Sequence, residues 1–330
     1  MTAHDEPQWH EGAFKGCTSL SSIALPEGLT TIGGAAFHSC ASLFSVLLPE
    51  GLTTIGDLAF YRCSSPTSIL LPEGFTTIGR HAFFQCTSLS SILLSEGLTT
   101  IGDGTFRGCT SVSSVTLPEG VTTIGGNAFL DCTSLSSVIL PEELTSIGGF
   151  AFCRCSSLTS IFLPEGLTTI GAGAFCRCSS LTSILLSEGL ATIGAGAFRD
   201  CTSLSSILFP DRLTTIGAEA FSGCTILEQR GRAAGHSFVM SYLRFISDPA
   251  NRRYAVLTSL ARLRSELYAR QAKRARHQAE DDDVEEEGGD EEVMDEQVGA
   301  LRGALAFDII HSDDLWRHIL EFVYVLTKSW

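Results

Sequence analysis

Cysteines are the residues of this 330-residue chain whose number and spacing could most readily support chemistry. A thiol can bind a metal ion, form a disulfide or act as a nucleophile. Ten of the twelve cysteines recur every 23 residues, and each follows a phenylalanine by three positions. This cysteine ladder consists of Cys17, Cys40, Cys63, Cys86, Cys109, Cys132, Cys155, Cys178, Cys201 and Cys224. Such recurrence predicts reduced thiols that face inward and pack as small apolar side chains.

Cys153 and Cys176 lie outside the ladder and form two Cys-Arg-Cys motifs one period apart. Neighbouring copies of one structural unit would bring these two thiols close enough for a disulfide or a shared metal ion. Their ladder neighbours Cys155 and Cys178 are expected to point into the core, so four thiols could not surround one ion. The sequence therefore favours a coincidence of duplicated units, and it predicts neither a metal nor a cofactor.

Signatures of common enzyme classes do not occur in the chain, which has no G-x-S-x-G, P-loop or H-E-x-x-H motif. Near-identical units also provide no pocket with convergent polar groups. We therefore expect a protein that is not an enzyme.

Acidic residues recur with the same 23-residue period and predict a charged row along one edge of the turns. This row is either simply solvated or attracts a basic partner. This glutamate row consists of Glu27, Glu50, Glu73, Glu96, Glu119, Glu142, Glu165 and Glu188, with Asp211 at its end.

Phenylalanines mark the repeating element that positions these residues. The phenylalanine ladder consists of Phe14, Phe37, Phe60, Phe83, Phe106, Phe129, Phe152, Phe175, Phe198 and Phe221. In one unit, residues 43–48 have the L-x-x-L-x-L spacing of a leucine-rich strand, residues 49–51 form a Pro-Glu-Gly turn, and residues 52–56 suit a second short strand. A 23-residue unit cannot bury its own apolar face. The units must therefore stack into a solenoid of about ten coils.

The repeats resemble the BspA-type leucine-rich repeat family, whose unit carries the signature P-x-x-(L/V)-T-x-I-G-x-x-A-F-x-x-C. The second unit matches it at Pro26, Ile32, Gly33, Ala36, Phe37 and Cys40, and most later units match as well. The resemblance covers about residues 12–227. It implies a repeat solenoid, a β-rich right-handed superhelix, to which the chain's own sequence after residue 248 adds a C-terminal α-helical extension. It also implies a ligand-binding array rather than an enzyme.

One outward-facing strand position is unusually apolar. The residue between two inward-facing strand residues points outward, and the family usually has threonine there. We call this row the apolar stripe: Ala24, Leu47, Leu70, Leu93, Thr116, Ile139, Phe162, Leu185 and Leu208. A serine stands two positions before each of its members. A contiguous exposed apolar surface marks an interaction site or an aggregation risk. The stripe therefore predicts a protein-binding face, with self-association and cover by the C-terminal helices as alternatives.

Composition divides the rest of the chain into short segments. Trp9 is expected to cover the open end of the solenoid, and residues 280–296 contain 12 acidic residues and no basic one. The predicted segments are an N-terminal cap (1–11), the solenoid (12–227), a capping linker (228–249), a basic amphipathic helix (250–279), an acidic disordered linker (280–299) and a C-terminal amphipathic helix (300–330).

Charge and terminal sequence predict the class of partner and the compartment. A net charge of −15 argues against nucleic acid, and no apolar run is long enough to span a membrane. The N-terminus lacks secretory features, so we expect a cytoplasmic or nuclear protein with reduced thiols. Three functions follow: a protein-binding scaffold, a ubiquitin-ligase adaptor or a surface adhesin. The adaptor is considered because residues 313–323 are similar to the opening helix of an F-box.

Overall fold

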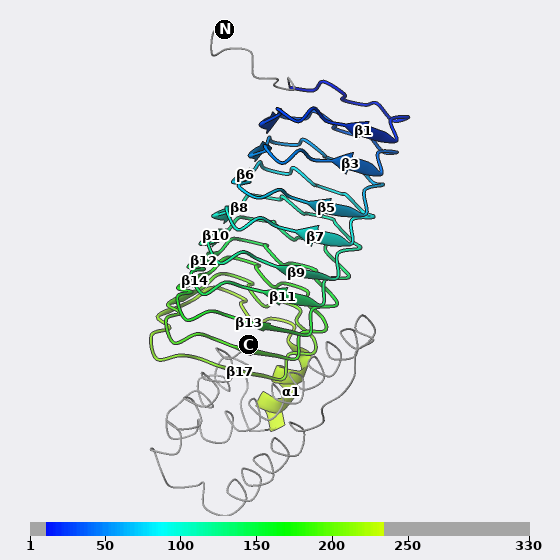
Figure 1. Cartoon of the computed structure of the whole chain (residues 1–330). Coiled ribbons are helices and arrows are strands. Elements are labelled where there is room, and N and C mark those ends of the chain that lie inside the picture. Colours follow the sequence, from blue (N-terminus) through cyan, green and yellow to red (C-terminus); the bar gives the residue numbers. More distant parts are fainter. Residues whose placement is uncertain (1–10, 234–330) are drawn as a thin grey trace, which may run out of the picture. The chain divides into compact units, whose positions relative to one another are not determined.

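The computed structural model describes residues 11–233 (Figure 1). The expectations for Trp9, for most of the capping linker, for both C-terminal helices and for the acidic linker concern residues outside this range.

Each coil contains two short strands, as the repeat predicts. The strands of the leucine-rich segment are β1 (Ser22–Ala24), β3 (Ser45–Leu47), β5 (Ser68–Leu70), β7 (Ser91–Leu93), β9 (Ser114–Thr116), β11 (Ser137–Ile139), β13 (Ser160–Phe162), β15 (Ser183–Leu185) and β17 (Ser206–Leu208). The strands that follow the turn are β2 (Thr31–Ile32), β4 (Thr54–Ile55), β6 (Thr77–Ile78), β8 (Thr100–Ile101), β10 (Thr123–Ile124), β12 (Ser146–Ile147), β14 (Thr169–Ile170), β16 (Thr192–Ile193) and β18 (Thr215–Ile216).

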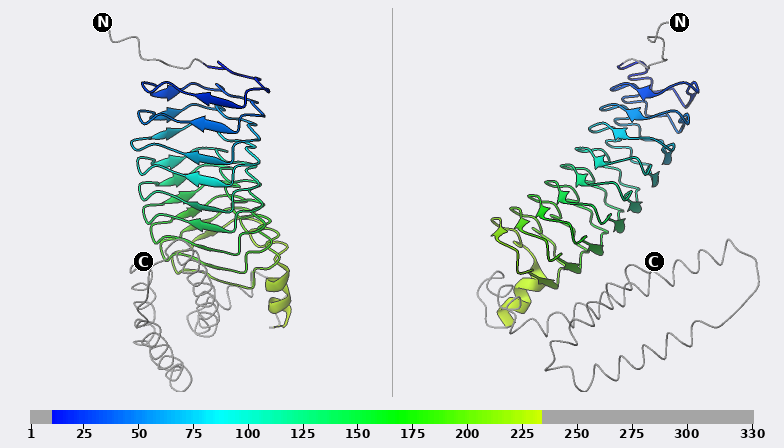
Figure 2. Two further views of the ribbon diagram at one scale, coloured as in Figure 1. Left: turned by 45° about the vertical axis from the view of Figure 1, so that its right-hand side comes forward. Right: turned by 60° about the vertical axis from the view of Figure 1, so that its left-hand side comes forward.

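Strand pairing follows the sequence period. Every pairing is parallel and joins residues 23 apart, as between Ser22 and Ser45 or between Thr31 and Thr54. The odd-numbered strands form the hydrogen-bonded groups β1-β3, β5-β7, β9-β11 and β13-β15-β17. The even-numbered strands form β2-β4-β6 and β8-β10-β12-β14-β16-β18. The predicted solenoid is confirmed, and Figure 2 shows its coils stacked one on the next.

The count of about ten coils needs a small correction, because the described residues contain nine strand pairs. After Phe221 the chain forms the helix α1 (Thr225–Ala233) instead of a tenth pair. Arg230 and Arg232 stand one period after Ile207 and Phe209, at positions where the other coils bury apolar side chains. A buried unpaired arginine costs several kcal/mol. The strand pattern therefore ends here, and Arg230 instead donates a 2.7 Å hydrogen bond to the Ser205 carbonyl oxygen.

The core consists of the stacked ladders. Neighbouring rings of the phenylalanine ladder lie 5.2–5.5 Å apart between centroids and within 18° of parallel. From Cys40 onward, each ladder cysteine donates a hydrogen bond from its Sγ to the carbonyl oxygen of the phenylalanine 26 residues earlier. For Cys63 and Phe37 this distance is 3.0 Å. The ladder thiols therefore join the coils as well as filling the core.

Glycine sets the close approach between coils at the end of most of the second strands. A Cβ atom on Gly148 would lie 2.6 Å from the carbonyl carbon of Gly125 and from the amide nitrogen of Gly126 in the preceding coil. Such contacts are not tolerated by real side chains. The recurrent Ile-Gly pair is thus a packing requirement of the stacked coils.

Candidate functional site

The apolar stripe lies on the odd-numbered strands and faces solvent. The exposed fraction is 75% for Leu47, 65% for Leu70 and 61% for Leu93, whereas the inward-facing Ile92 is buried. Ala24 and Thr116 are also exposed. Exposure decreases further along the row, to 43% for Ile139 and 38% for both Phe162 and Leu185, and Leu208 is half-buried.

The most accessible part of this face lies on the first strands of the solenoid. The serines beside the stripe are exposed on β1, β3, β5, β7 and β9, whereas Ser160 and Ser183 are buried. Phe44, immediately before β3, is 60% exposed and extends the apolar surface next to Leu47. Sequence reasoning missed Phe44, although it is the single aromatic residue in a column of serines and threonines. We take Phe44, Leu47, Leu70 and Leu93 as the centre of the candidate site.

The glutamate row runs beside the stripe. Each glutamate of the row is exposed, and each follows its stripe residue by three positions, as Glu50 follows Leu47. Three residues span at most about 10 Å, so carboxylates border the apolar surface in every coil. The ion pairs between described residues involve other acids, such as Asp103, Asp131 and Asp200. The eight glutamates of the row therefore carry charges that none of these ion pairs neutralises.

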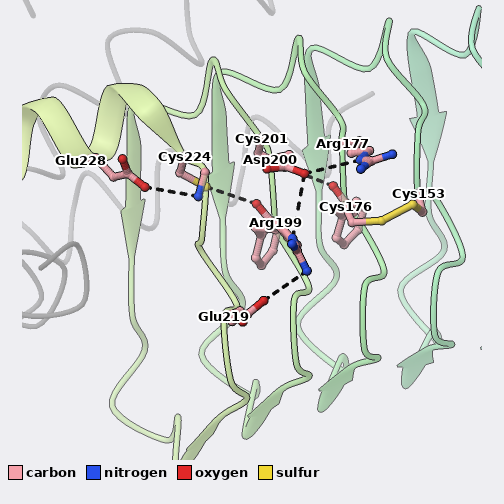
Figure 3. Close-up of polar contacts among 12 residues, drawn as sticks. Cys153, Cys176, Arg177, Arg199, Asp200, Cys201, Glu219, Cys224 and Glu228 are labelled. Atoms are coloured by element: carbon pink, nitrogen blue, oxygen red, sulfur yellow. Dashed lines mark hydrogen bonds and ion pairs between the residues drawn. A yellow bond between two sulfur atoms is a disulfide. The ribbon is translucent and has the colours of Figure 1, made fainter.

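Cys153 and Cys176 form a disulfide between adjacent coils (Figure 3). The sequence allowed this disulfide but favoured a coincidence of duplicated units, in which the two thiols have no special role. The structure shows the bond and corrects that preference. Equivalent positions of stacked coils face each other with a Cα–Cα distance of 4.6 Å, within the usual range for a disulfide. The alternative of a shared metal ion gains no support, because no group of three or more suitable ligands occurs among residues 11–233.

A shallow cavity of about 650 Å³ lies over the disulfide, lined by several arginines and acids. Three of its four guanidinium groups are paired with acids within the solenoid, and the fourth, of Arg107, lies over the Phe84 ring. Arg154 lies 3.2 Å from Asp131 and Arg177 lies 3.4 Å from Asp200. Figure 3 shows a similar contact between Arg199 and Glu219, 3.1 Å apart. These pairs leave little unbalanced charge for a ligand, so the strand face remains the better candidate site.

The thiols of the cysteine ladder are in surroundings that make them poor nucleophiles and poor metal ligands. All ten ladder thiols are free, and all except Cys17 are buried. Burial raises the pKa of Cys63 and of Cys132 to about 12, because a thiolate loses its hydration in the apolar core. Nucleophilic or metal-binding cysteines need the opposite shift of pKa. The predicted apolar packing role of the ladder agrees with this environment.

The chain is similar to several solved structures. None of the curated proteins compared with the chain matches it. A leucine-rich repeat protein of Bacteroides ovatus ATCC 8483 is 26% identical, covering 67% of this chain and 80% of that one, with a TM-score of 0.39. A leucine rich cell surface protein of Faecalibacterium prausnitzii A2-165 is 25% identical over 66% and 81% of the two chains, with a TM-score of 0.38. The pneumococcal vaccine antigen PcpA is 26% identical over 62% and 60%, with a TM-score of 0.46.

The family comparison covers most of the chain. The sequence pattern of the BspA type leucine rich repeat region, six copies long, matches residues 8–136 and again residues 99–228. These two matches together contain β1 to β18 and both ladders. The chain therefore belongs to the BspA-type leucine-rich repeat family.

Proposed function

We propose that this protein is a non-enzymatic scaffold that binds another protein through its strand face. The observation that carries the proposal is the 61–75% exposure of Leu47, Leu70 and Leu93 on β3, β5 and β7, in three successive coils of the solenoid. Complete burial of one leucine is worth about 1.5–3 kcal/mol. Covering all three would therefore contribute several kcal/mol to association, and keeping them exposed brings no stability to the isolated chain.

The chemistry of the described residues supports binding rather than catalysis. Raised pKa values keep the buried ladder thiols protonated. The exposed carboxylates repeat in near-identical surroundings, whereas acid–base catalysis needs groups whose environments differ. The adaptor alternative depends on residues 313–323, outside the described part of the chain. It therefore remains a prediction from sequence, and so does the adhesin.

The predicted compartment and the disulfide lead to opposite expectations. A cytoplasmic or nuclear location is reducing, whereas disulfides such as Cys153–Cys176 persist mainly in oxidising compartments. No helix within residues 11–233 is long and apolar enough to cross a membrane. Alkylation of free thiols in freshly lysed cells, followed by mass spectrometry, will decide between the two. A blocked Cys176 indicates a reducing compartment, and a Cys153–Cys176 cross-linked peptide indicates an oxidising one.

The binding proposal is tested with paired affinity baits. The variant L47T/L70T/L93T places at each site the residue found in the stripe at Thr116, so the strands are preserved. Phe150→Asn is the matched control. The Phe150 side chain is aromatic and 47% exposed, and it is not a member of the stripe. Its backbone φ is 56°, and Asn127 occupies the equivalent position of the preceding coil with the same φ. Asparagine therefore suits the backbone at this position. Proteins captured by wild type and control but lost by the triple variant support the proposal. Identical captures by all three baits would refute it.

A further inference from the structure

The apolar stripe and the glutamate row form one composite surface, and their shared geometry narrows the kind of partner. Parallel in-register pairing gives each coil one member of each row, with coils about 4.8 Å apart along a sheet. The short link from Leu70 to Glu73 keeps the rows within about 10 Å of each other. A partner that lies along the stripe therefore meets a line of carboxylates on one flank.

The glutamate row makes this flank strongly anionic. Two unit charges 4.8 Å apart repel by about 0.9 kcal/mol even in bulk water. Each interior glutamate has an acidic residue at the equivalent position of the coil on either side, and none of the ion pairs among residues 11–233 includes a glutamate of the row. Lysine or arginine side chains of a partner would relieve it. A second copy stacked antiparallel on this face would bring its own carboxylates against the row, which disfavours that homodimer.

The spacing of the stripe fits a helix better than a strand. An α-helix advances 5.4 Å per turn and presents one apolar residue per turn at i, i+3 or i+4. This step exceeds the spacing of paired strands by about 0.6 Å, so the mismatch between Leu70 on β5 and Leu93 on β7, which pair with each other, stays below 1 Å. A strand presents same-side residues about every 6.6 Å and falls out of register within two coils. A helix is also about 10–12 Å wide, which lets one helix cover both rows.

We infer that the strand face recognises a basic amphipathic helix of the partner protein, which lies along the solenoid axis. Its apolar side contacts Phe44, Leu47, Leu70 and Leu93, and its lysines or arginines lie over Glu50, Glu73 and Glu96. This inference rests on the proposed binding function and adds the class of ligand. The chain's own residues 250–279 and a second copy are the competing occupants.

The inference is tested with two fluorescent synthetic helices of 18 residues and the full-length protein. Both peptides carry leucine at i, i+3 and i+4, and they differ in having lysine or glutamate on one flank. We expect saturable binding of the lysine peptide, at least tenfold weaker binding of the glutamate peptide, and an affinity that falls with added salt. The variants L47T/L70T/L93T and E50Q/E73Q/E96Q should each weaken binding at least fivefold, whereas Phe150→Asn should not change it.

Other results separate this inference from the proposed function. If captured natural partners depend on the leucines but bind E50Q/E73Q/E96Q normally, the scaffold function stands and the basic helix is wrong. Equal binding of both peptides, or binding of neither, overturns the inference too. A dimer that dissociates in the leucine variant assigns the face to a second copy. Peptide binding that appears only after R270Q/K273Q/R274Q assigns the face to the chain's own basic segment.

Discussion

Alkaline pH should unfold this protein because its core holds a row of protonated thiols. Burial raises the pKa of Cys63, Cys132, Cys178 and Cys224 from the ordinary value of 9.0 to about 12. The pKa values of four more buried ladder cysteines are also well above 9.0: Cys86, Cys109, Cys155 and Cys201. Between pH 9 and 12 the folded chain keeps protons that the unfolded chain releases. The stabilising effect of these thiols is therefore complete below pH 9 and is lost as pH rises towards 12.

The size of the effect follows from proton linkage. At pH 10, one unit above the ordinary pKa, each thiol favours the unfolded state by about 1.4 kcal/mol. Eight such thiols amount to about 11 kcal/mol, which is comparable to the whole stability of an ordinary domain at about 5–15 kcal/mol. We therefore expect the free energy of unfolding to decrease steeply above pH 9, with release of up to eight protons per molecule.

Guanidinium unfolding followed by circular dichroism, without reductant and under argon, measures this slope between pH 8 and 10. The variant C86A/C109A should lower the free energy of unfolding at pH 8, because two core side chains are truncated. Its further decrease at pH 10 should be smaller than that of wild type by about 3 kcal/mol. Cys17→Ala is the control, because Cys17 is the exposed member of the ladder. A pH dependence that is the same for wild type and C86A/C109A would refute the reasoning.

Three further predictions concern packing, the disulfide and thiol access. Gly148→Ala should lower the free energy of unfolding by about 1–3 kcal/mol, since its Cβ would overlap the preceding coil's backbone; an unchanged denaturation midpoint would contradict the close approach. Cys153→Ser should lower this free energy by about 3 kcal/mol, because the disulfide closes a 23-residue loop; a smaller loss than Cys17→Ser causes would show that Cys153 and Cys176 are not bonded in solution. A thiol reagent at pH 8 should label one cysteine of the native protein, Cys17, and ten after unfolding; rapid labelling of a second thiol would contradict the sealed core.

The repeat made most of the fold predictable from the sequence. In a solenoid, each coil contacts only its neighbours, so one 23-residue pattern fixes the strands, the turns and the stacking together. Phe83 and Cys86 could be placed in the core because inward-facing positions recur with the period. Leu70 and Glu73 could be placed outside for the same reason, which is why the candidate binding face was predictable.

Features that break or join the repeats required the tertiary structure. Arg230 indicates that the strand pattern ends, but nothing local shows that α1 replaces the tenth pair. The pairing of Cys153 with Cys176 depends on the distance between equivalent positions of two coils, which the period suggests but does not fix. Exposure differs within the stripe, from 75% at Leu47 to 38% at Leu185, although their local sequences are nearly the same. A periodic sequence thus determines the geometry within each coil and between neighbouring coils. Bonds between particular side chains, the end of the stack and the accessible part of its face depend on how the coils are positioned in space.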